Sequence, residues 1–174
     1  MLAGIRFCLM MGTKRFYWIL GACCLLLVWL WQLPCLFVEG SDGFIAVIPA
    51  RAGQPFSIHF IHSVQRTPVE ENLQINGARN GFDLLSTKYQ SFGVGLPFLS
   101  SEGDFQQQGD YFVLGNMDRH FSSLKLRTGT GTELSLDVAG KRYPLYSLLP
   151  SGSEVRLYIA PWYQRIVGYF IRFA

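Results

Sequence analysis

The chain has 174 residues, of which 49% are hydrophobic and 16% are charged, and its formal net charge at pH 7 is +3. This length allows one domain of ordinary size with an appendage, and the hydrophobic share is high for a protein that meets only water. Three of the 15 basic residues precede residue 16, and the other 12 balance the 12 acidic residues, which argues against a nucleic-acid partner because such a partner needs a basic face.

An uncharged stretch, FYWILGACCLLLVWLWQLPCLFV, runs from Phe16 to Val38. A helix rises about 1.5 Å per residue, so this stretch is long enough for the ~30 Å hydrocarbon core of a bilayer. Arg6, Lys14 and Arg15 precede it, and the first acidic residue, Glu39, follows it. The positive-inside rule then predicts a cytoplasmic segment at 1–15, a transmembrane anchor at 16–38 and an extracytoplasmic domain at 39–174, with the protein in the cytoplasmic (inner) membrane.

Two other interpretations of this stretch compete with a retained anchor. A cleaved signal peptide has an apolar region of about 7–15 residues followed by small residues, whereas this one is longer and ends in Pro-Cys-Leu-Phe-Val. The anchor is favoured, and cleavage stays open. The Leu20–Cys23 segment also resembles a lipid-modification box, but too few apolar residues precede it. All four cysteines lie at or before Cys35, so the predicted exported domain has no disulfide and no cysteine-bound metal.

The exported part reads as an all-β domain, a small antiparallel barrel or sandwich preceded by the one transmembrane helix. Short apolar or alternating runs recur with Gly, Asn, Asp and Ser between them. The predicted strands are 44–48, 56–64, 69–75, 82–89, 111–114, 122–127, 133–138, 143–148 and 154–159. The tail 161–173 fits either a last strand or a short amphipathic helix at a membrane interface.

The stretch HFIHSVQRTPVEENLQI, from His59 to Ile75, contains the first candidate site. Side chains alternate along a strand, so His62 points with the hydrophobic residues and His59 points away from them. A hairpin closed through residues 65–68 then has one register that opposes each apolar residue to another apolar residue and the inward histidine to the inward carboxylate. Its pairs are Val64 with Val69, His62 with Glu71, Phe60 with Leu73 and Ile58 with Ile75. We therefore expect a cross-strand pair of His62 and Glu71 on the core side.

A buried imidazole–carboxylate pair is more often a structural contact than an active site, and we favour the structural interpretation. Ser63 faces away from His62, which weakens a serine–histidine dyad. The alternative is a small hydrolase or metal-dependent enzyme that combines His62 and Glu71 with His120 or Asp104. On the favoured interpretation the chain has no catalytic residues, no metal and no cofactor.

A second informative stretch, YQSFGVGLPFLSSEGDF, begins at Tyr89. Gly93 and Gly95 are followed by Pro97, which predicts that a strand ends there in a tight bend. Such a bend is either a bulge at the corner of a sheet or a loop whose amides meet a ligand.

Both stretches together resemble the signature of a bacterial family, domain of unknown function 1850. The residues that carry the resemblance are His62, Ser63, Pro68, Glu71, Ser91, Gly93, Gly95 and Pro97. The family is found beside tripartite ATP-independent periplasmic (TRAP) transporters of the TAXI type. The resemblance implies a membrane-anchored periplasmic accessory or binding domain without established catalysis. Its expected partners are the transporter permease or substrate-binding protein, together with the lipid bilayer.

Overall fold

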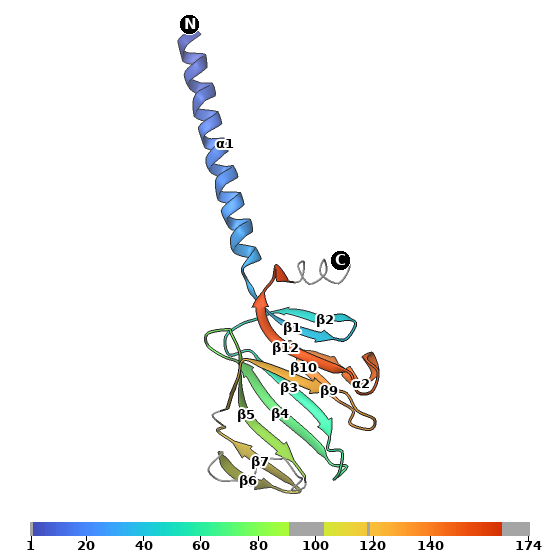
Figure 1. Cartoon of the computed structure of the whole chain (residues 1–174). Helices are drawn as coiled ribbons and strands as arrows, with labels where there is room; N and C mark the ends of the chain where they lie inside the picture. The colour runs from blue at the N-terminus through green and yellow to red at the C-terminus, as the bar shows by residue number, and fades with distance from the viewer. Residues whose placement is uncertain (1, 91–102, 118, 165–174) are drawn as a thin grey trace. The chain divides into compact units, whose positions relative to one another are not determined.

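The computed structural model describes residues 2–90, 103–117 and 119–164, with side chains from Phe16 onward. The chain divides into two compact units (Figure 1). One unit is Pro34–Ala160, and the other joins Met1–Leu33 with Pro161–Ala174.

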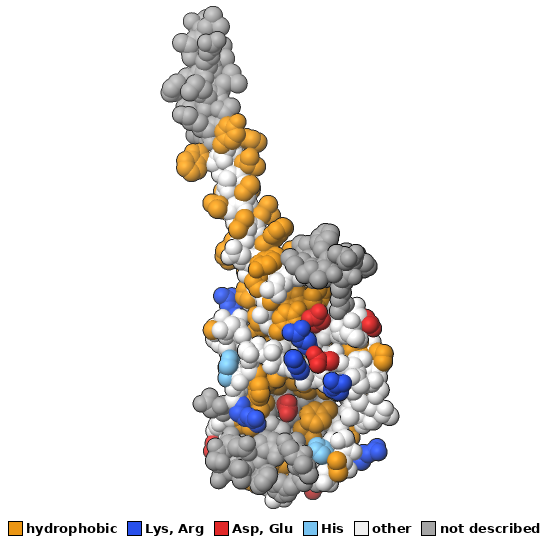
Figure 2. Space-filling model, in the orientation of Figure 1, with side chains coloured by type: hydrophobic (Ala, Val, Ile, Leu, Met, Phe, Trp, Pro, Cys, Tyr) orange, Lys and Arg blue, Asp and Glu red, His pale blue; other side chains and the backbone are white. Residues whose placement is uncertain are grey.

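The first unit is built on helix α1 (Leu2–Trp31). Its described side chains, from Phe16 to Trp31, are exposed, and none of them is charged (Figure 2). The helix ends in a tighter turn, whose hydrogen bonds join residues three apart. The N–H of Gln32 donates to the Trp29 carbonyl and that of Leu33 to the Leu30 carbonyl. The N–H of Trp162 donates to the Leu33 carbonyl and that of Tyr163 to the Trp31 carbonyl. Among the described residues, no helix has the length and apolar character required to cross a membrane.

The boundary predicted for the anchor at Val38 is wrong. The helix ends at Trp31, and Pro34–Gly40 forms the first strand of the other unit. The run from Cys35 to Val38 is fully apolar, and such a run cannot be assigned to a helix or a buried strand by periodicity alone. Pro34 carries the signal that decides it, because proline disfavours helical geometry in the residue before it. Cys35 therefore lies buried inside the β domain, contrary to the expectation of a cysteine-free domain.

The second unit consists of twelve strands and one short helix among the described residues. Helix α2 covers Leu145–Leu148. The strands are β1 (Pro34–Gly40), β2 (Gly43–Pro49), β3 (Pro55–Ile61), β4 (Pro68–Ile75), β5 (Phe82–Tyr89), β6 (Asp104–Gln108), β7 (Tyr111–Gly115), β8 (Arg119–Phe121), β9 (Ser123–Arg127), β10 (Ser135–Val138), β11 (Lys141–Tyr143) and β12 (Glu154–Pro161).

The strands form two antiparallel sheets, and neither closes into a barrel. The smaller sheet has the order β2-β1-β12-β9, and the larger one has the order β11-β10-β3-β4-β5-β7-β6, with β8 beside β5. One hydrophobic cluster joins the inner faces of both sheets: Leu36 and Leu157 come from the smaller sheet, and Ile58 and Leu73 come from the larger. The fold is thus mostly β, as expected, but the barrel alternative is excluded for the described strands.

Most of the predicted strands are found close to their predicted bounds, and two differences have a clear physical cause. The strand predicted to run to Val64 ends at Ile61, because residues 62–67 turn the chain. Of the segment 143–148, Tyr143 ends β11 and Leu145–Leu148 form helix α2 rather than a strand, since Pro144 opens a single helical turn whose Leu145 is buried. Of the tail predicted at 161–173, residues 165–173 lie outside the described residues.

Because α1 ends at Trp31, two leucines of the stretch 16–38 should differ in their effect on stability. Leu36 is fully buried in the shared core and Leu27 is 58% exposed on α1. We expect Leu36→Ala to lower the free energy of unfolding of the β domain by about 2–5 kcal/mol, because it leaves a cavity. Leu27→Ala, which removes the same atoms, is the matched control and leaves it unchanged. Urea unfolding of the full chain in detergent, followed by the β-sheet circular dichroism band, measures both. Equal effects of the two substitutions would contradict this boundary.

Candidate functional site

The β3–β4 hairpin holds the first half of the predicted signature, and its register differs from the predicted one. The observed register opposes Ile58 to Glu71, His59 to Glu70 and Phe60 to Val69. The predicted pairing of His62 with Glu71 is therefore wrong. The prediction placed the turn at residues 65–68, whereas the chain turns over residues 62–67, and this shifts every partner by four residues.

His62 is part of that turn rather than of a strand. Its N–H donates to the Thr67 carbonyl at 2.9 Å, and its own carbonyl accepts from Arg66 N–H at 2.9 Å. Its ring Nδ1 accepts from the N–H groups of Val64 at 3.3 Å and Gln65 at 3.2 Å. These bonds satisfy backbone donors that a turn leaves without ladder partners. The side chain of His62 thus organises the turn, and Ser63 and Pro68 lie exposed at its two ends.

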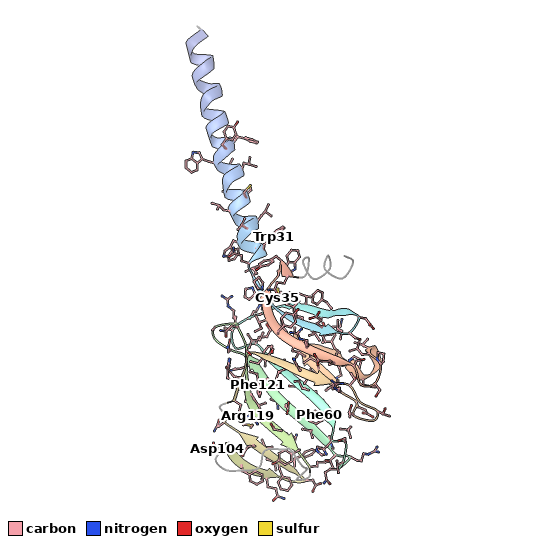
Figure 3. All side chains as sticks on the ribbon, in the orientation of Figure 1. Trp31, Cys35, Phe60, Asp104, Arg119 and Phe121 are labelled. Atoms are coloured by element: carbon pink, nitrogen blue, oxygen red, sulfur yellow. The ribbon has the colours of Figure 1, made fainter. Side chains whose placement is uncertain are left out.

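Glu71 points to the core side of β4, as predicted, but its neighbours are not the expected ones. It lies between Ile58 on β3 and Thr87 on β5. The Thr87 hydroxyl is within 3.6 Å of Met117 Sδ. Burial raises the pKa of Glu71, and the positive charge of Arg119, labelled in Figure 3, partly offsets that rise. Within the described ranges, Glu71 has no hydrogen bond or ion pair through its side chain.

The other predicted site residues are not brought to Glu71 by any hydrogen bond. His120 Nδ1 lies 3.0 Å from Asp83 Oδ1, and Asp104 accepts from the side-chain amide of Asn116. Neither bonds to His62 or Glu71 in the structure, so the enzyme arrangement that combined His62 and Glu71 with either of them is not observed. Ser91, Gly93, Gly95 and Pro97 lie outside the described residues.

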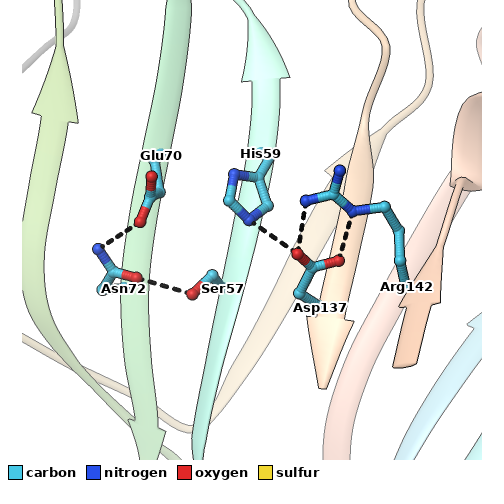
Figure 4. A network of polar contacts seen from close by, with 6 residues as sticks. All are labelled: Ser57, His59, Glu70, Asn72, Asp137 and Arg142. Carbon is cyan, nitrogen blue, oxygen red and sulfur yellow. Dashed lines mark hydrogen bonds and ion pairs between the residues drawn. The ribbon is translucent and has the colours of Figure 1, made fainter. Parts of the chain in front are cut away.

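The outer face of the larger sheet carries a polar arrangement that the sequence did not reveal (Figure 4). Two rows of directly opposed residues cross β10, β3, β4 and β5. The first row is Ser135, His59, Glu70 and Lys88, and the second is Asp137, Ser57, Asn72 and Ser86. Arg142 of β11 extends the second row, because it lies opposite Asp137. Most of these side chains are half-buried, although they belong to an outer face.

Asp137 connects three strands of this face. Its Oδ1 accepts from Arg142 Nε at 2.7 Å and its Oδ2 from Arg142 Nη2 at 2.6 Å, a two-pronged contact. His59 Nε2 lies 3.2 Å from the same Oδ2. The hydrogen bonds and positive charge of Arg142, with a smaller contribution from His59, hold the pKa of Asp137 below its ordinary value although burial opposes this. The carboxylate is therefore charged at neutral pH.

The second row is joined by side-chain hydrogen bonds. Ser57 Oγ donates to Asn72 Oδ1 at 2.7 Å, and the Asn72 amide donates to Glu70 Oε1 at 3.0 Å and contacts Ser86 Oγ at 3.4 Å. The Ser57 hydroxyl therefore donates its proton to an amide oxygen and not to His59. A nucleophilic serine needs a base that accepts its proton, so these contacts do not build one.

A pocket of about 240 Å³ opens on this face. Its lining includes His59, Glu70 and Lys88 of the first row, together with Tyr111 of β7 and Arg142 of β11. In the described part of the chain, no group of three or more His, Cys, Asp or Glu residues is arranged to hold a metal ion. The charged side chains that line this pocket can offer opposite charges and hydrogen-bonding groups to a small polar molecule.

One known family matches more than half of the chain. The model of the family described as "Domain of unknown function (DUF1850)" matches residues 56–145. The chain belongs to the DUF1850 family. The matched region begins in β3 and ends at the start of α2, so it contains both polar rows and the pocket. Neither a curated protein nor a solved structure matches the chain.

Sequence reasoning missed Asp137, Arg142 and Lys88 as site residues. A sequence signal for the first two exists in Gly140, since glycine is favoured in two-residue hairpin turns, and Ala139 and Gly140 form such a turn with positive φ of 51° and 74°. Such a turn places the residues on either side of it opposite one another, Asp137 against Arg142 among them. No comparable local signal links Asp137 to His59, because β10 and β3 are distant in sequence.

The environment of Glu71 predicts that removal of its charge stabilises the domain at neutral pH. Its pKa is raised in the folded state, so the stability that depends on it is fully present below the unfolded pKa of about 4.3 and is lost as the pH rises through the folded pKa. We expect Glu71→Gln to melt at a higher temperature than the unmodified chain at pH 7 and at the same temperature below pH 4.

Thermal melts of both chains across that pH range test this expectation. Glu154→Gln, at an exposed position of β12, serves as the control and should change the melting temperature at neither pH. A lower melting temperature for Glu71→Gln at pH 7 would mean that the carboxylate has a stabilising partner and that its burial is not a net cost to the fold.

Proposed function

We propose that the chain is a membrane-anchored, extracytoplasmic binding domain without catalytic activity. The observation that carries this proposal is the surface of α1, where large apolar side chains from Phe16 to Trp31 are exposed in succession. A contiguous exposed apolar surface of this kind indicates contact with lipid or with another protein. Trp29 and Trp31, at the end of the helix, are the residue type favoured at the headgroup level of a bilayer.

The orientation in the membrane is part of the same proposal. The basic residues Arg6, Lys14 and Arg15 precede the apolar surface, and acidic residues occur only after it. This asymmetry supports a single-pass arrangement in the cytoplasmic membrane, with the N-terminus inside and the β domain in the periplasm. The proposed anchor ends with α1 at Trp31, and it has to include helix residues before Phe16, because the described residues alone do not make up a membrane span.

Binding is favoured over catalysis by the chemistry of the outer face. Asp137 is held by Arg142 and His59, and Ser57 is held by Asn72. An enzyme that used acid–base chemistry would need one of these groups directed at a reacting atom. The face instead presents fixed charges over an open surface, which suits recognition.

The partner is proposed from the family resemblance. A DUF1850 domain found beside TAXI-type TRAP transporters fits an accessory role, in which the domain contacts the permease or its substrate-binding protein. Anchorage at the outer side of the membrane would keep the domain close to both. This accessory role also requires no catalytic residue.

The orientation is tested with fusions to the C-terminus of the full chain in a bacterial host. We expect alkaline phosphatase to be active and green fluorescent protein to be dark, because the first needs the periplasm and the second fails to fold after export. The protein should also resist extraction by alkaline carbonate. Leu26→Arg should weaken that retention, since a central arginine costs about 2.5–3.5 kcal/mol on insertion. A fluorescent fusion or a readily extracted protein would contradict the proposal.

The partner is tested by affinity purification of the tagged full chain from detergent-solubilised membranes that contain a TAXI-type transporter. We expect the permease or the substrate-binding protein to be recovered in fixed proportion to the chain. An unrelated single-pass protein with the same tag is the control for carry-over. Recovery of the transporter at the level of that control would overturn the accessory role.

A further inference from the structure

Two opposite charges of the first polar row face each other and yet do not pair. Glu70 of β4 and Lys88 of β5 are direct cross-strand partners. Opposite charges at such positions attract and ordinarily stabilise a sheet. In the described part of the chain, however, neither the ion pairs that join His59 and Arg142 to Asp137 nor the one that joins His120 to Asp83 involves these two residues. The Glu70–Lys88 pair is not among them.

Each of these two charges is held by a different neighbour. The Lys88 ammonium lies over the ring of Tyr111, 4.4 Å from its centroid. The Glu70 carboxylate accepts from the Asn72 amide at 3.0 Å. Asn72 is in turn fixed by Ser57, so the second row holds the Glu70 carboxylate at Asn72. The result is a cation and an anion that are half-buried, adjacent and separate.

Both charges line the 240 Å³ pocket, together with Tyr111. Pockets for drug-sized ligands measure about 300–1,000 Å³, so this one suits a smaller molecule.

We propose that this pocket binds a small zwitterion of the amino-acid class. Lys88 receives the ligand carboxylate, Glu70 receives its ammonium group, and the Tyr111 ring forms one wall. The inference rests on the binding role proposed above and specifies the ligand of that same face.

Other classes of ligand leave part of this site unsatisfied. A simple carboxylate would meet Lys88 but would face the negative charge of Glu70 across the same strand pair. A simple amine would meet Glu70 but would face Lys88. A neutral sugar would leave both charges partly desolvated without a counter-charge, which is unfavourable in a half-buried site. A zwitterion satisfies both at once.

The test is a titration of the full chain, in detergent, with each of the standard amino acids, measured by isothermal calorimetry. We expect saturable binding of at least one of them. The matched amine and carboxylic acid, which each lack one of the two charged groups, should bind at least about tenfold more weakly, because a hydrogen bond to a charged group is lost. Absence of binding by every amino acid, or equal binding of one of the two analogues, overturns the inference.

Variants assign the binding to this pocket. Lys88→Met and Glu70→Gln should each raise the Kd at least about tenfold, for the same reason. Lys141→Met is the matched control, because Lys141 also lies over a tyrosine ring, that of Tyr143 at 4.8 Å, but outside this pocket. An equal loss of affinity in the Lys141 variant overturns the assignment. Melting temperatures of the variants separate loss of the site from loss of the fold.

The two proposals can fail independently. If the transporter co-purifies with the chain but no amino acid binds, the ligand inference fails and the accessory role stands. If an amino acid binds but the transporter is not recovered, the accessory role fails and the pocket stands.

Discussion

The turn of residues 62–67 determines how the central strands of the larger sheet face one another. The two backbone bonds between His62 and residues 66 and 67 close it, and the His62 ring holds the N–H groups within it. Because strand partners are fixed by the turn that joins them, a shift there would move every residue of β4 along β3. The register places Glu71 beside Ile58 and His59 beside Glu70, so the turn fixes the composition of both faces.

The position of β3 also determines which residues of the neighbouring strands meet on the outer face. His59 can contact Asp137 only because β10 lies beside β3 with Ser135 opposite His59. Asp137 then ties β11 to the same surface through Arg142, across a tight two-residue turn. The polar rows therefore have their origin in backbone geometry, and their side-chain bonds follow from it. A face of this kind has little freedom to rearrange one strand at a time.

The sequence predicted the class of fold and the inward direction of Glu71, because alternation along a strand is a local property. It also predicted β5 from Phe82 to Tyr89 with the observed bounds. It misassigned Cys35–Val38, since a strand buried on both faces is as apolar as a membrane helix. It also misassigned the partner of His62. The predicted register opposed each apolar residue to another apolar residue, whereas the observed one opposes Ile58 to Glu71, so the hydrophobic pattern favoured the wrong register. The contact of His59 with Asp137 depends on strands far apart in the chain, which no local pattern encodes.

Cys35 has a consequence for a domain proposed to work outside the cytoplasm. It lies buried in β1, with 4% of its surface exposed, and burial raises the pKa of its thiol. Oxidation and disulfide exchange proceed through the thiolate, which burial both suppresses and shields. An oxidising compartment would therefore have little chemical access to this sulfur while the domain is folded. The thiol becomes reactive only when the strand leaves the core, so its modification would report the history of unfolding of each molecule.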